Sequence, residues 1–460
     1  MATREIALGD VLSCKDQSTG EVGVLHIETD RIWVDFIGFG EKTTIDVNSP
    51  IHLLTEKGWV VSLFDNVDLS PSRPFWRKGE VGHVHHTRIL SNLALAGPTA
   101  WKVEDQAKSV SFGVFPEFDF LWPKDLLAEI AETSCEIVPK NDLLSVVTSW
   151  GDLTLRIALQ DDPIRNKWMP THPWFKLQFE HGLSPSKCLE CVEYFIRLFI
   201  LMSWKDVQSA EVTIRRMGDD GQIFSHRILT VQHIERTDED ALRKKDLTPL
   251  FMDTLGDRET TKSVFKAWLD RMDEWQEITA FIRRASNQLM RVSEERALDA
   301  CRWHETIERD LKKKENAVAP PGMKEVVEAA VAKAEECRLD GDWIGRIKSS
   351  LKGLKGETRR ERFQGLIATL NDQLGLDLFD ALSEEMMRDC YKTRQQAGHG
   401  TSGKMSPNQV RDLWGNVLAM ETLCMARILS ELPISDRGRK LLEMHPLIKH
   451  FSELRKERSV

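Results

Sequence analysis

The first part of the chain is dominated by short apolar segments that are typical of β-strands. Residues 31–39 (RIWVDFIGF) are rich in β-branched and aromatic side chains and are bounded by polar and turn-forming residues. The segments 87–95 and 110–115 have the same character and precede a cluster of Phe, Trp and Pro that ends at Pro123. We therefore expect a β-rich N-terminal domain over residues 1–125.

Residues 126–255 predict a second β-rich region that contains one buried helix. Apolar residues alternate with polar ones over 153–159 and again over 175–179, which favours an antiparallel sheet with one buried face. A Ser-Pro pair at 184–185 is a typical helix start, and residues 192–202 are apolar nearly all round. This helix is expected to pack on the sheet.

The pattern changes to helical spacing after residue 255. Charged and apolar positions alternate at three and four residues over 262–284 and 285–314, and a Pro-Pro-Gly break follows at 320–322. Further helical segments continue to the C-terminus. We expect an all-α domain over residues 256–460, and therefore an α+β fold in which antiparallel β-rich regions precede a helical bundle.

Composition describes a globular chain with a local excess of basic residues. Of the 460 residues, 41% are apolar and 29% are charged, which excludes a disordered or collagen-like protein. The net charge of −9 argues against indiscriminate binding along nucleic acid, because that binding depends on neutralising phosphates. Residues 341–460, however, hold 20 lysines and arginines against 16 aspartates and glutamates. A phosphate-rich partner should therefore meet this C-terminal segment.

The same sequence predicts a cytoplasmic protein without metal or cofactor. No apolar run approaches the roughly 20 residues of a membrane span, and the N-terminus lacks the apolar core of a signal peptide. The eight cysteines should then remain free thiols. Cys188 and Cys191 form an isolated Cys-x-x-Cys pair without two further ligands at suitable spacing, so packing is the better interpretation.

One apolar helical stripe in the C-terminal domain ends on a cation. The position that follows it is Arg394, and the stripe itself comprises Phe379, Leu382, Met386 and Cys390. A guanidinium at a core position is costly unless it meets an anion or opens into a cleft. Arg394 is therefore a candidate functional residue.

A histidine follows in the expected connection to the next helix. Glycines flank His399, so the first helix should end there. The next helix should begin at Ser406, because Pro407 suits the first helical position and Gln409 completes a capping box. His399 would thus lie about one turn from Arg394.

This pair suits RNA cleavage without a metal. A histidine with a pKa of roughly 6.5 can remove a proton from a ribose 2′-hydroxyl or return one to the leaving 5′-oxygen. An arginine can stabilise the phosphate as negative charge develops. The spacing by itself is weak support. An arginine that is separated from a following histidine by four to six residues also occurs at Arg77 and His83, Arg165 and His172, Arg227 and His233, and Arg439 and His445.

The C-terminal segment resembles a known family. Residues 350–376 (SLKGLKGETRRERFQGLIATLNDQLGL) and 386–432 (MMRDCYKTRQQAGHGTSGKMSPNQVRDLWGNVLAMETLCMARILSEL) are similar to the C-terminal HEPN domain of ApeA-like anti-phage defence proteins. The motif of these domains is an Arg, a polar residue, three to five further residues and a His, and here Arg394, Gln395 and His399 occupy those places. The β-rich part resembles the N-terminal half of such proteins less specifically.

The resemblance implies a metal-independent endoribonuclease that acts in abortive infection. It further implies a composite site where two HEPN domains pair in a homodimer, with a phage-derived signal as trigger and RNA as substrate. Basic residues around the motif are expected to contact this RNA, namely Arg388, Lys392, Lys404 and Arg411.

One position departs from the family. Most HEPN ribonucleases have Asn after the motif arginine, whereas this chain has Gln395, which is one methylene longer. A non-catalytic HEPN module that dimerises or binds RNA therefore remains the main alternative, and a toxin neutralised by a separate antitoxin is another.

Overall fold

The chain forms two compact units, which are described separately. One comprises residues 1–200, 206–248 and 253–272, and the other comprises residues 201–205, 249–252 and 273–460. The computed structural model describes residues 6–7, 9–28, 31–39, 45–69, 84–115, 121, 124–132, 142–162, 166–218, 220–229, 258–288, 292–312, 322–353, 359–398 and 406–458.

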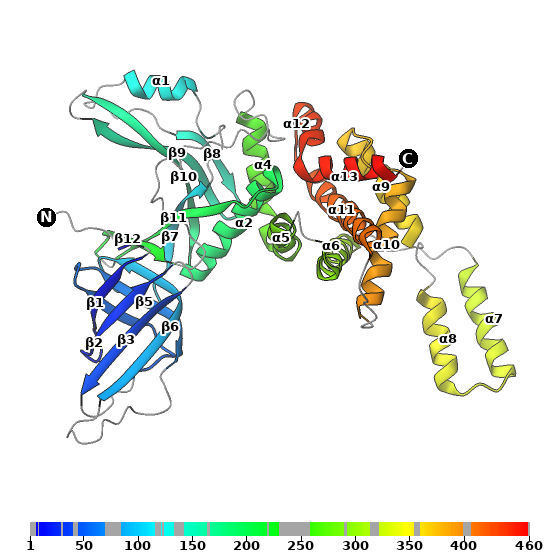
Figure 1. The fold of residues 1–460 in the computed structure, drawn as a ribbon, viewed down its shortest axis with the longest axis horizontal. Coiled ribbons are helices and arrows are strands. Elements are labelled where there is room, and N and C mark those ends of the chain that lie inside the picture. The colour runs from blue at the N-terminus through cyan, green and yellow to red at the C-terminus, as the bar shows by residue number, and fades with distance from the viewer. Residues whose placement is uncertain are drawn as a thin grey trace. The chain divides into compact units, whose positions relative to one another are not determined.

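The first unit contains a twelve-stranded antiparallel sheet (Figure 1). The strand order is β3-β2-β1-β4-β5-β6-β12-β11-β7-β10-β9-β8. The strands are β1 (Val11–Asp16), β2 (Val22–Ile27), β3 (Ile32–Phe39), β4 (Ile51–Thr55), β5 (Val60–Asp68), β6 (Val84–Gly97), β7 (Ala107–Phe115), β8 (Asp142–Thr148), β9 (Gly151–Asp162), β10 (Lys167–Leu183), β11 (Gln208–Met217) and β12 (Ile223–Leu229).

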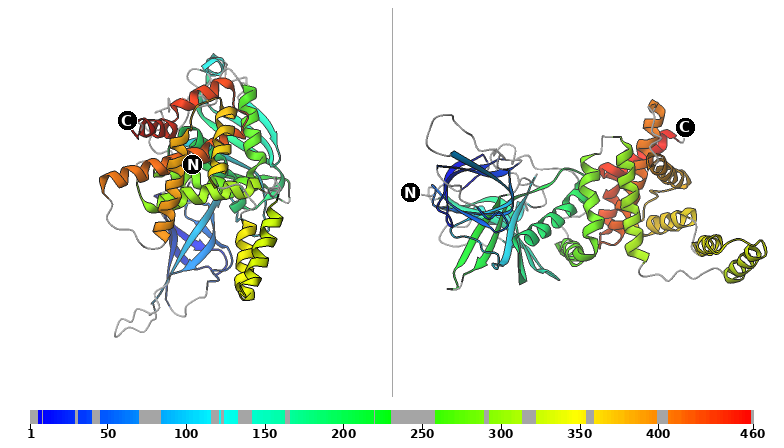
Figure 2. Two further views of the ribbon diagram at one scale, coloured as in Figure 1. Left: turned by 90° about the vertical axis from the view of Figure 1, so that its right-hand side faces the viewer. Right: turned by 90° about the horizontal axis from the view of Figure 1, so that it is seen from below.

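The first six strands close into a ring. An additional pairing joins β3 to β6, with Ile32 opposite Ser91 and Phe39 opposite Val84, and Figure 2 shows the ring nearly end-on in its right panel. Side chains alternate between the interior and the outside, as in β1, where Leu12 and Cys14 are buried and their neighbours are exposed. Because every second side chain is buried, a shift of one residue would expose the apolar side chains, and this fixes the register of the strands. The ring interior is a closed hydrophobic core.

The sheet continues past the ring without a break near residue 125. Strand β6 pairs with β12, and β7, which lies before that boundary in the sequence, pairs with β10 and β11, which lie after it. Hydrogen bonds of one sheet therefore join the segments 1–125 and 126–255 that the sequence analysis treated as separate domains.

An aromatic core lies between the sheet and one helix. The predicted helix is α2 (Pro185–Ser203), and its residues from Val192 to Met202 are largely buried, as expected. Phe175 on β10 lies 5.0 Å from Phe195 of α2, measured between ring centroids. The predicted alternation is also confirmed, since Leu153, Leu155, Ile157, Phe175, Leu177 and Phe179 are all buried, while Leu159 near the end of β9 is half-buried. Two further helices of this unit are α1 (Lys124–Glu132) and α4 (Arg258–Asp270).

The second unit is helical, which confirms the α+β class. Its helices are α5 (Met272–Asn287), α6 (Glu294–Lys312), α7 (Met323–Glu336), α8 (Gly341–Gly353), α9 (Arg359–Leu374), α10 (Ala381–Gly398), α11 (Pro407–Ser430), α12 (Asp436–Leu441), the 3₁₀ helix η2 (Leu442–Met444) and α13 (Pro446–Arg458). The helix breaks differ from those expected: α4 ends at Asp270 and α6 begins at Glu294, where the side chain of Ser293 accepts a hydrogen bond from the Arg296 amide.

Helix α11 is the centre of this unit and contains a buried charge. Most of its residues from Leu413 to Leu429 are buried, including Glu421. The Glu421 carboxylate accepts two hydrogen bonds from Arg296 of α6, from Nε at 2.8 Å and from an Nη atom at 2.6 Å. Both side chains are 2% exposed. The attraction between the two groups offsets the cost of removing them from water only when both hydrogen bonds form. The pair therefore stabilises one register between α6 and α11.

A buried histidine follows η2. The Nε2 atom of His445 lies 2.9 Å from the backbone carbonyl oxygen of Leu201, so Nε2 carries the proton and donates it. The Nδ1 atom is buried and has no hydrogen-bond partner among the described residues. Burial lowers the pKa of His445 from 6.5 to about 4.

Loss of the Glu421 charge should strongly destabilise the helical unit. Glu421→Gln leaves the Arg296 guanidinium buried without its counter-ion, which costs about 3–5 kcal/mol of unfolding free energy. The exposed pair between Arg411 and Glu457 is the control, because Glu457→Gln should cost less than about 1 kcal/mol. Urea unfolding followed by circular dichroism measures both, and equal losses would contradict the structural role.

His445 should make the stability of the helical unit sensitive to acid. Its folded pKa of about 4 is below the ordinary 6.5, so the stabilisation is present above pH 6.5 and is lost as the pH falls toward 4. In His445→Gln, which keeps a donor for the Leu201 carbonyl, this loss should be smaller by about 3 kcal/mol between pH 7 and pH 4. Urea unfolding of both proteins at each pH tests this, and parallel pH profiles would contradict it.

Candidate functional site

The stripe that predicted the site is present on α10. Phe379 just before the helix is buried, as are Met386 and Cys390, and Leu382 is half-buried. Arg394 continues this stripe, and its side chain is 32% exposed. The guanidinium thus lies at the edge of the core.

Helices α6 and α10 run side by side in the same direction. The Cys301 thiol donates to the Cys390 sulfur at 3.7 Å, and His304 Nδ1 lies 3.0 Å from the Tyr391 hydroxyl. Glu305 then pairs with Arg394. These contacts advance along both helices together, so α6 determines what each position of α10 meets.

The anion that Arg394 meets is the Glu305 carboxylate. An Nη atom of the guanidinium donates to a carboxylate oxygen, and this hydrogen bond raises the pKa of Arg394. The guanidinium also lies 6.0 Å from the ring centroid of Tyr391, which is buried. Glu305 is 40% exposed, so the ion pair is open to solvent on one side.

The start of the next helix is as predicted. Ser406 caps α11, its hydroxyl accepts from the Gln409 amide, and the Gln409 side chain accepts from the Ser406 amide. The preceding helix, α10, ends at Gly398. His399 and Lys404 belong to the connection between these helices, which lies outside the described residues.

The other predicted residues of α10 are on its outer side. Gln395 is exposed. Arg388 pairs with Glu384 at 3.1 Å, and Lys392, whose side chain is 71% exposed, pairs with Asp389 at 2.7 Å. The Lys392–Asp389 pair is exposed, is worth a few tenths of a kcal/mol and is readily exchanged for a phosphate. The Arg388–Glu384 pair lies deeper, because the Glu384 side chain is only 6% exposed.

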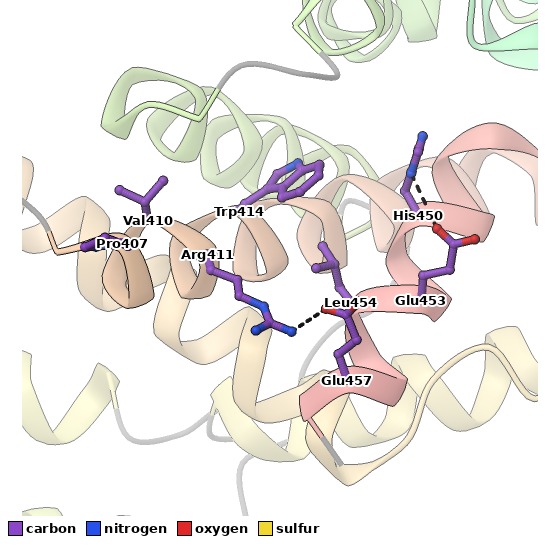
Figure 3. Close-up of a pocket in the computed structure, with 8 residues that line it drawn as sticks. All are labelled: Pro407, Val410, Arg411, Trp414, His450, Glu453, Leu454 and Glu457. Carbon is purple, nitrogen blue, oxygen red and sulfur yellow. Dashed lines mark hydrogen bonds and ion pairs between the residues drawn. The ribbon is translucent and has the colours of Figure 1, made fainter. Parts of the chain in front are cut away.

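Arg411 lines a groove between α11 and α13 (Figure 3). The groove has a volume of about 350 Å³. Its walls include Val410 and Trp414 from α11 and Leu454 from α13, and Arg411 crosses it to pair with Glu457. Glu457 of α13 therefore holds Arg411 in place. Among the described residues that were predicted to contact RNA, Arg411 is the one that lines this groove.

Three thiols of the helical unit are packing residues, whereas Cys337 is exposed. Cys301, Cys390 and Cys424 are buried, and the hydrogen bond from Cys301 together with burial raises the pKa of Cys390 well above its usual value. Among the described residues, no group of three or more His, Cys, Asp and Glu side chains is arranged to hold a metal ion. No helix in the described part of the chain has the length and apolar content to cross a bilayer.

Sequence reasoning missed one residue of this site, Glu305. It lies 89 positions before Arg394, on a helix of mixed charge, and no local pattern distinguishes it from neighbouring acids. The signal that existed was indirect, because an arginine at a core position required an anion somewhere.

Comparison with known proteins adds no identification. No family model and no curated protein matches this chain. A solved structure described as "pT26-6p" is similar at 8% identity, with 96% of this chain and 70% of that chain covered and a TM-score of 0.16. Similarity at this level carries no argument about fold or function.

Removal of the Glu305 charge should make Arg394 more reactive. Phenylglyoxal modifies neutral guanidines, and Glu305→Gln removes the hydrogen-bonded carboxylate that keeps Arg394 protonated, so modification of Arg394 should become several-fold faster at pH 8. Peptide mass spectrometry measures the rate. Glu277→Gln, which removes the carboxylate that pairs with Arg309 of α6 instead, should leave the rate at Arg394 unchanged. An unchanged rate in Glu305→Gln would contradict the pairing.

Proposed function

We propose that this protein is a metal-independent HEPN-type endoribonuclease, which cleaves RNA by attack of a ribose 2′-hydroxyl on the adjacent phosphodiester. The sequence resemblance supplies the family, and Arg394, Gln395 and His399 are the proposed site residues. The observation that carries the proposal is the partly exposed ion pair of Arg394 with Glu305 at the end of α10.

The ion pair supports an anion-binding role for Arg394. A carboxylate and a phosphate present similar oxygen pairs to a guanidinium, so a position that receives Glu305 can also receive a phosphodiester. About a third of the Arg394 side chain is accessible, which leaves room for a ligand to replace or join Glu305. Arg394 would then stabilise the charge that develops on the phosphate oxygens.

The proton transfers are assigned to His399. It follows α10 directly in the chain, five positions after Arg394, and the last turn of a helix favours positive charge. His399 would remove the proton from the 2′-hydroxyl and protonate the leaving 5′-oxygen. Gln395 is exposed beside Arg394 and can donate its amide to a phosphate oxygen.

The biological setting is proposed from the resemblance. We infer anti-phage defence by abortive infection, a homodimer that pairs two HEPN domains, and activation by a phage-derived signal. Arg388, Lys392, Lys404 and Arg411 are proposed to guide the RNA backbone. Lys392 and Arg411 make exposed ion pairs that they can exchange for a phosphate, and such neutralisation of phosphates releases counter-ions.

His399→Ala and Arg394→Ala should each abolish cleavage while the chain stays folded. We expect the rate on a labelled single-stranded RNA to fall roughly a hundredfold or more. Circular dichroism should be unchanged, because the ion pair that Arg394 makes is half-exposed and worth at most about 1 kcal/mol. Gel electrophoresis of the products, with excess EDTA present throughout, measures the rate.

Two variants serve as controls for this experiment. Arg309→Ala removes an exposed arginine of α6, and His450→Ala removes a half-buried histidine of α13, so both should cleave as the natural protein does. RNA binding without cleavage by the natural chain would favour the non-catalytic scaffold, for which Gln395 is the supporting feature. Cleavage that stops on addition of EDTA would contradict the metal-independent chemistry.

A further inference from the structure

The sheet of the first unit has a polar face opposite α2. On β10, the side chains of Phe175, Leu177 and Phe179 are buried on the α2 side, whereas Lys176 and Gln178 alternate with them on the other face. Gln178 is exposed and Lys176 is half-buried, so this face reaches solvent. The proposed cleavage residues belong to the second unit, so this face is a separate feature of the chain.

A row of hydroxyl and cationic side chains crosses this face in register. Lys176 of β10 lies opposite Thr154 on one side and Ser111 on the other, and the pairing continues outward on both sides. The complete row across six adjacent strands is Ser145, Thr154, Lys176, Ser111, Thr213 and Arg227. Neighbouring strands are about 4.8 Å apart, so the row spans roughly 24 Å. It contains hydroxyls and cations and no carboxylate.

The next row adds a second cation close to Lys176. Arg215 of β11 lies opposite Ser109, two residues along β7 from the partner of Lys176. Arg215 is exposed, and no described carboxylate forms an ion pair with Arg215 or Lys176. The acid of this row is Asp152, on β9, opposite Gln178. The centre of the face therefore has two cations that form no ion pair with a described residue, with Asp152 as a diagonal neighbour of Lys176, although the whole chain is acidic.

The protonation of Lys176 reflects these surroundings. Burial lowers the pKa of Lys176, and repulsion from Arg215 and Arg156 lowers it further. Arg156 already has a counter-ion, Asp142, at 2.7 Å. Lys176 is thus an ammonium that is partly desolvated and repelled by its neighbours, and a bound anion would relieve both costs.

An aromatic side chain lies beside the cations. Trp174 precedes Lys176 by two residues on the same face of β10 and is half-buried, opposite Arg156. Its ring lies 4.9 Å from that of His172, measured between centroids. Cations that follow a backbone, next to an aromatic ring on which a base can stack, are the features that bind single-stranded nucleic acid. A sheet face that carried only hydroxyls would not attract a polyanion in this way.

We propose that this face of the sheet binds single-stranded RNA. Lys176 and Arg215 contact successive phosphates, Trp174 stacks on a base, and the hydroxyls of Ser111 and Thr213 lie where they can accept or donate hydrogen bonds to the ribose. This function is distinct from cleavage and does not depend on Arg394.

The test is a binding titration on the full chain carrying Arg394→Ala, which removes the phosphate contact proposed for cleavage and leaves the other helical-unit cations the same in every variant compared. The ligand is a fluorescein-labelled 2′-O-methyl oligouridylate of about 12 nucleotides, which has no 2′-hydroxyl to react. Fluorescence anisotropy over a range of salt concentrations gives the affinity and its salt dependence. Addition of Lys176→Gln and Arg215→Gln should weaken binding at least about tenfold and reduce the slope of log K against log salt by about 1.4.

Further variants separate the contributions and provide the control. Trp174→Leu should weaken binding at least about fivefold with the salt slope unchanged, because stacking releases no counter-ions. Lys15→Gln with Arg31→Gln removes the same charge from exposed positions on the closed ring and should leave binding unchanged.

Four results would overturn the proposal. Binding could be unaffected by loss of Lys176 and Arg215, or it could fall equally in the control with Lys15 and Arg31 replaced, which would indicate a general effect of charge. Competition by uridine monophosphate at the same concentration of phosphate as the oligonucleotide would show that a single nucleotide suffices. Unchanged affinity in Trp174→Leu would show a polyanion surface without base stacking.

Discussion

The helical unit depends on the buried ion pair between Arg296 and Glu421. Two charges removed from water are stabilised only if the guanidinium fork meets both carboxylate oxygens, which permits one register between α6 and α11. Glu305 lies nine residues after Arg296 on the same helix, so this register also decides where its carboxylate meets α10. The position of Arg394 at the edge of the core therefore follows from a contact elsewhere in the bundle.

The same constraint explains why an arginine is tolerated on an apolar stripe. Met386 and Cys390 bury that face of α10, and burial would be costly for the next residue if α6 offered only apolar groups. Glu305 supplies a counter-ion, and the end of the helix leaves the pair partly open to water. The ion pair is therefore packed against the core on one side and open to solvent on the other.

The first unit shows that a chain with a negative net charge can still have a surface with clustered cations. The chain is acidic, yet one register of the sheet places Lys176 and Arg215 two residues apart across β7 with no carboxylate between them. The other face of the same strands packs aromatic rings on α2, so these positions cannot turn inward. Antiparallel pairing thus gathers residues from six strands into one polar surface.

Local rules determined much of what could be read from the sequence. The capping box at Ser406, the helix start at 184–185 and the alternation in β9 and β10 depend on residues within a few positions of each other, and each was predicted. Closure of β3 on β6, the pairing of β7 with β10 and β11, and the partner of Arg394 depend on contacts tens of residues apart. Such contacts depend on how the whole chain packs. Only the tertiary structure could therefore show that Glu305 is the anion that an arginine on an apolar stripe requires.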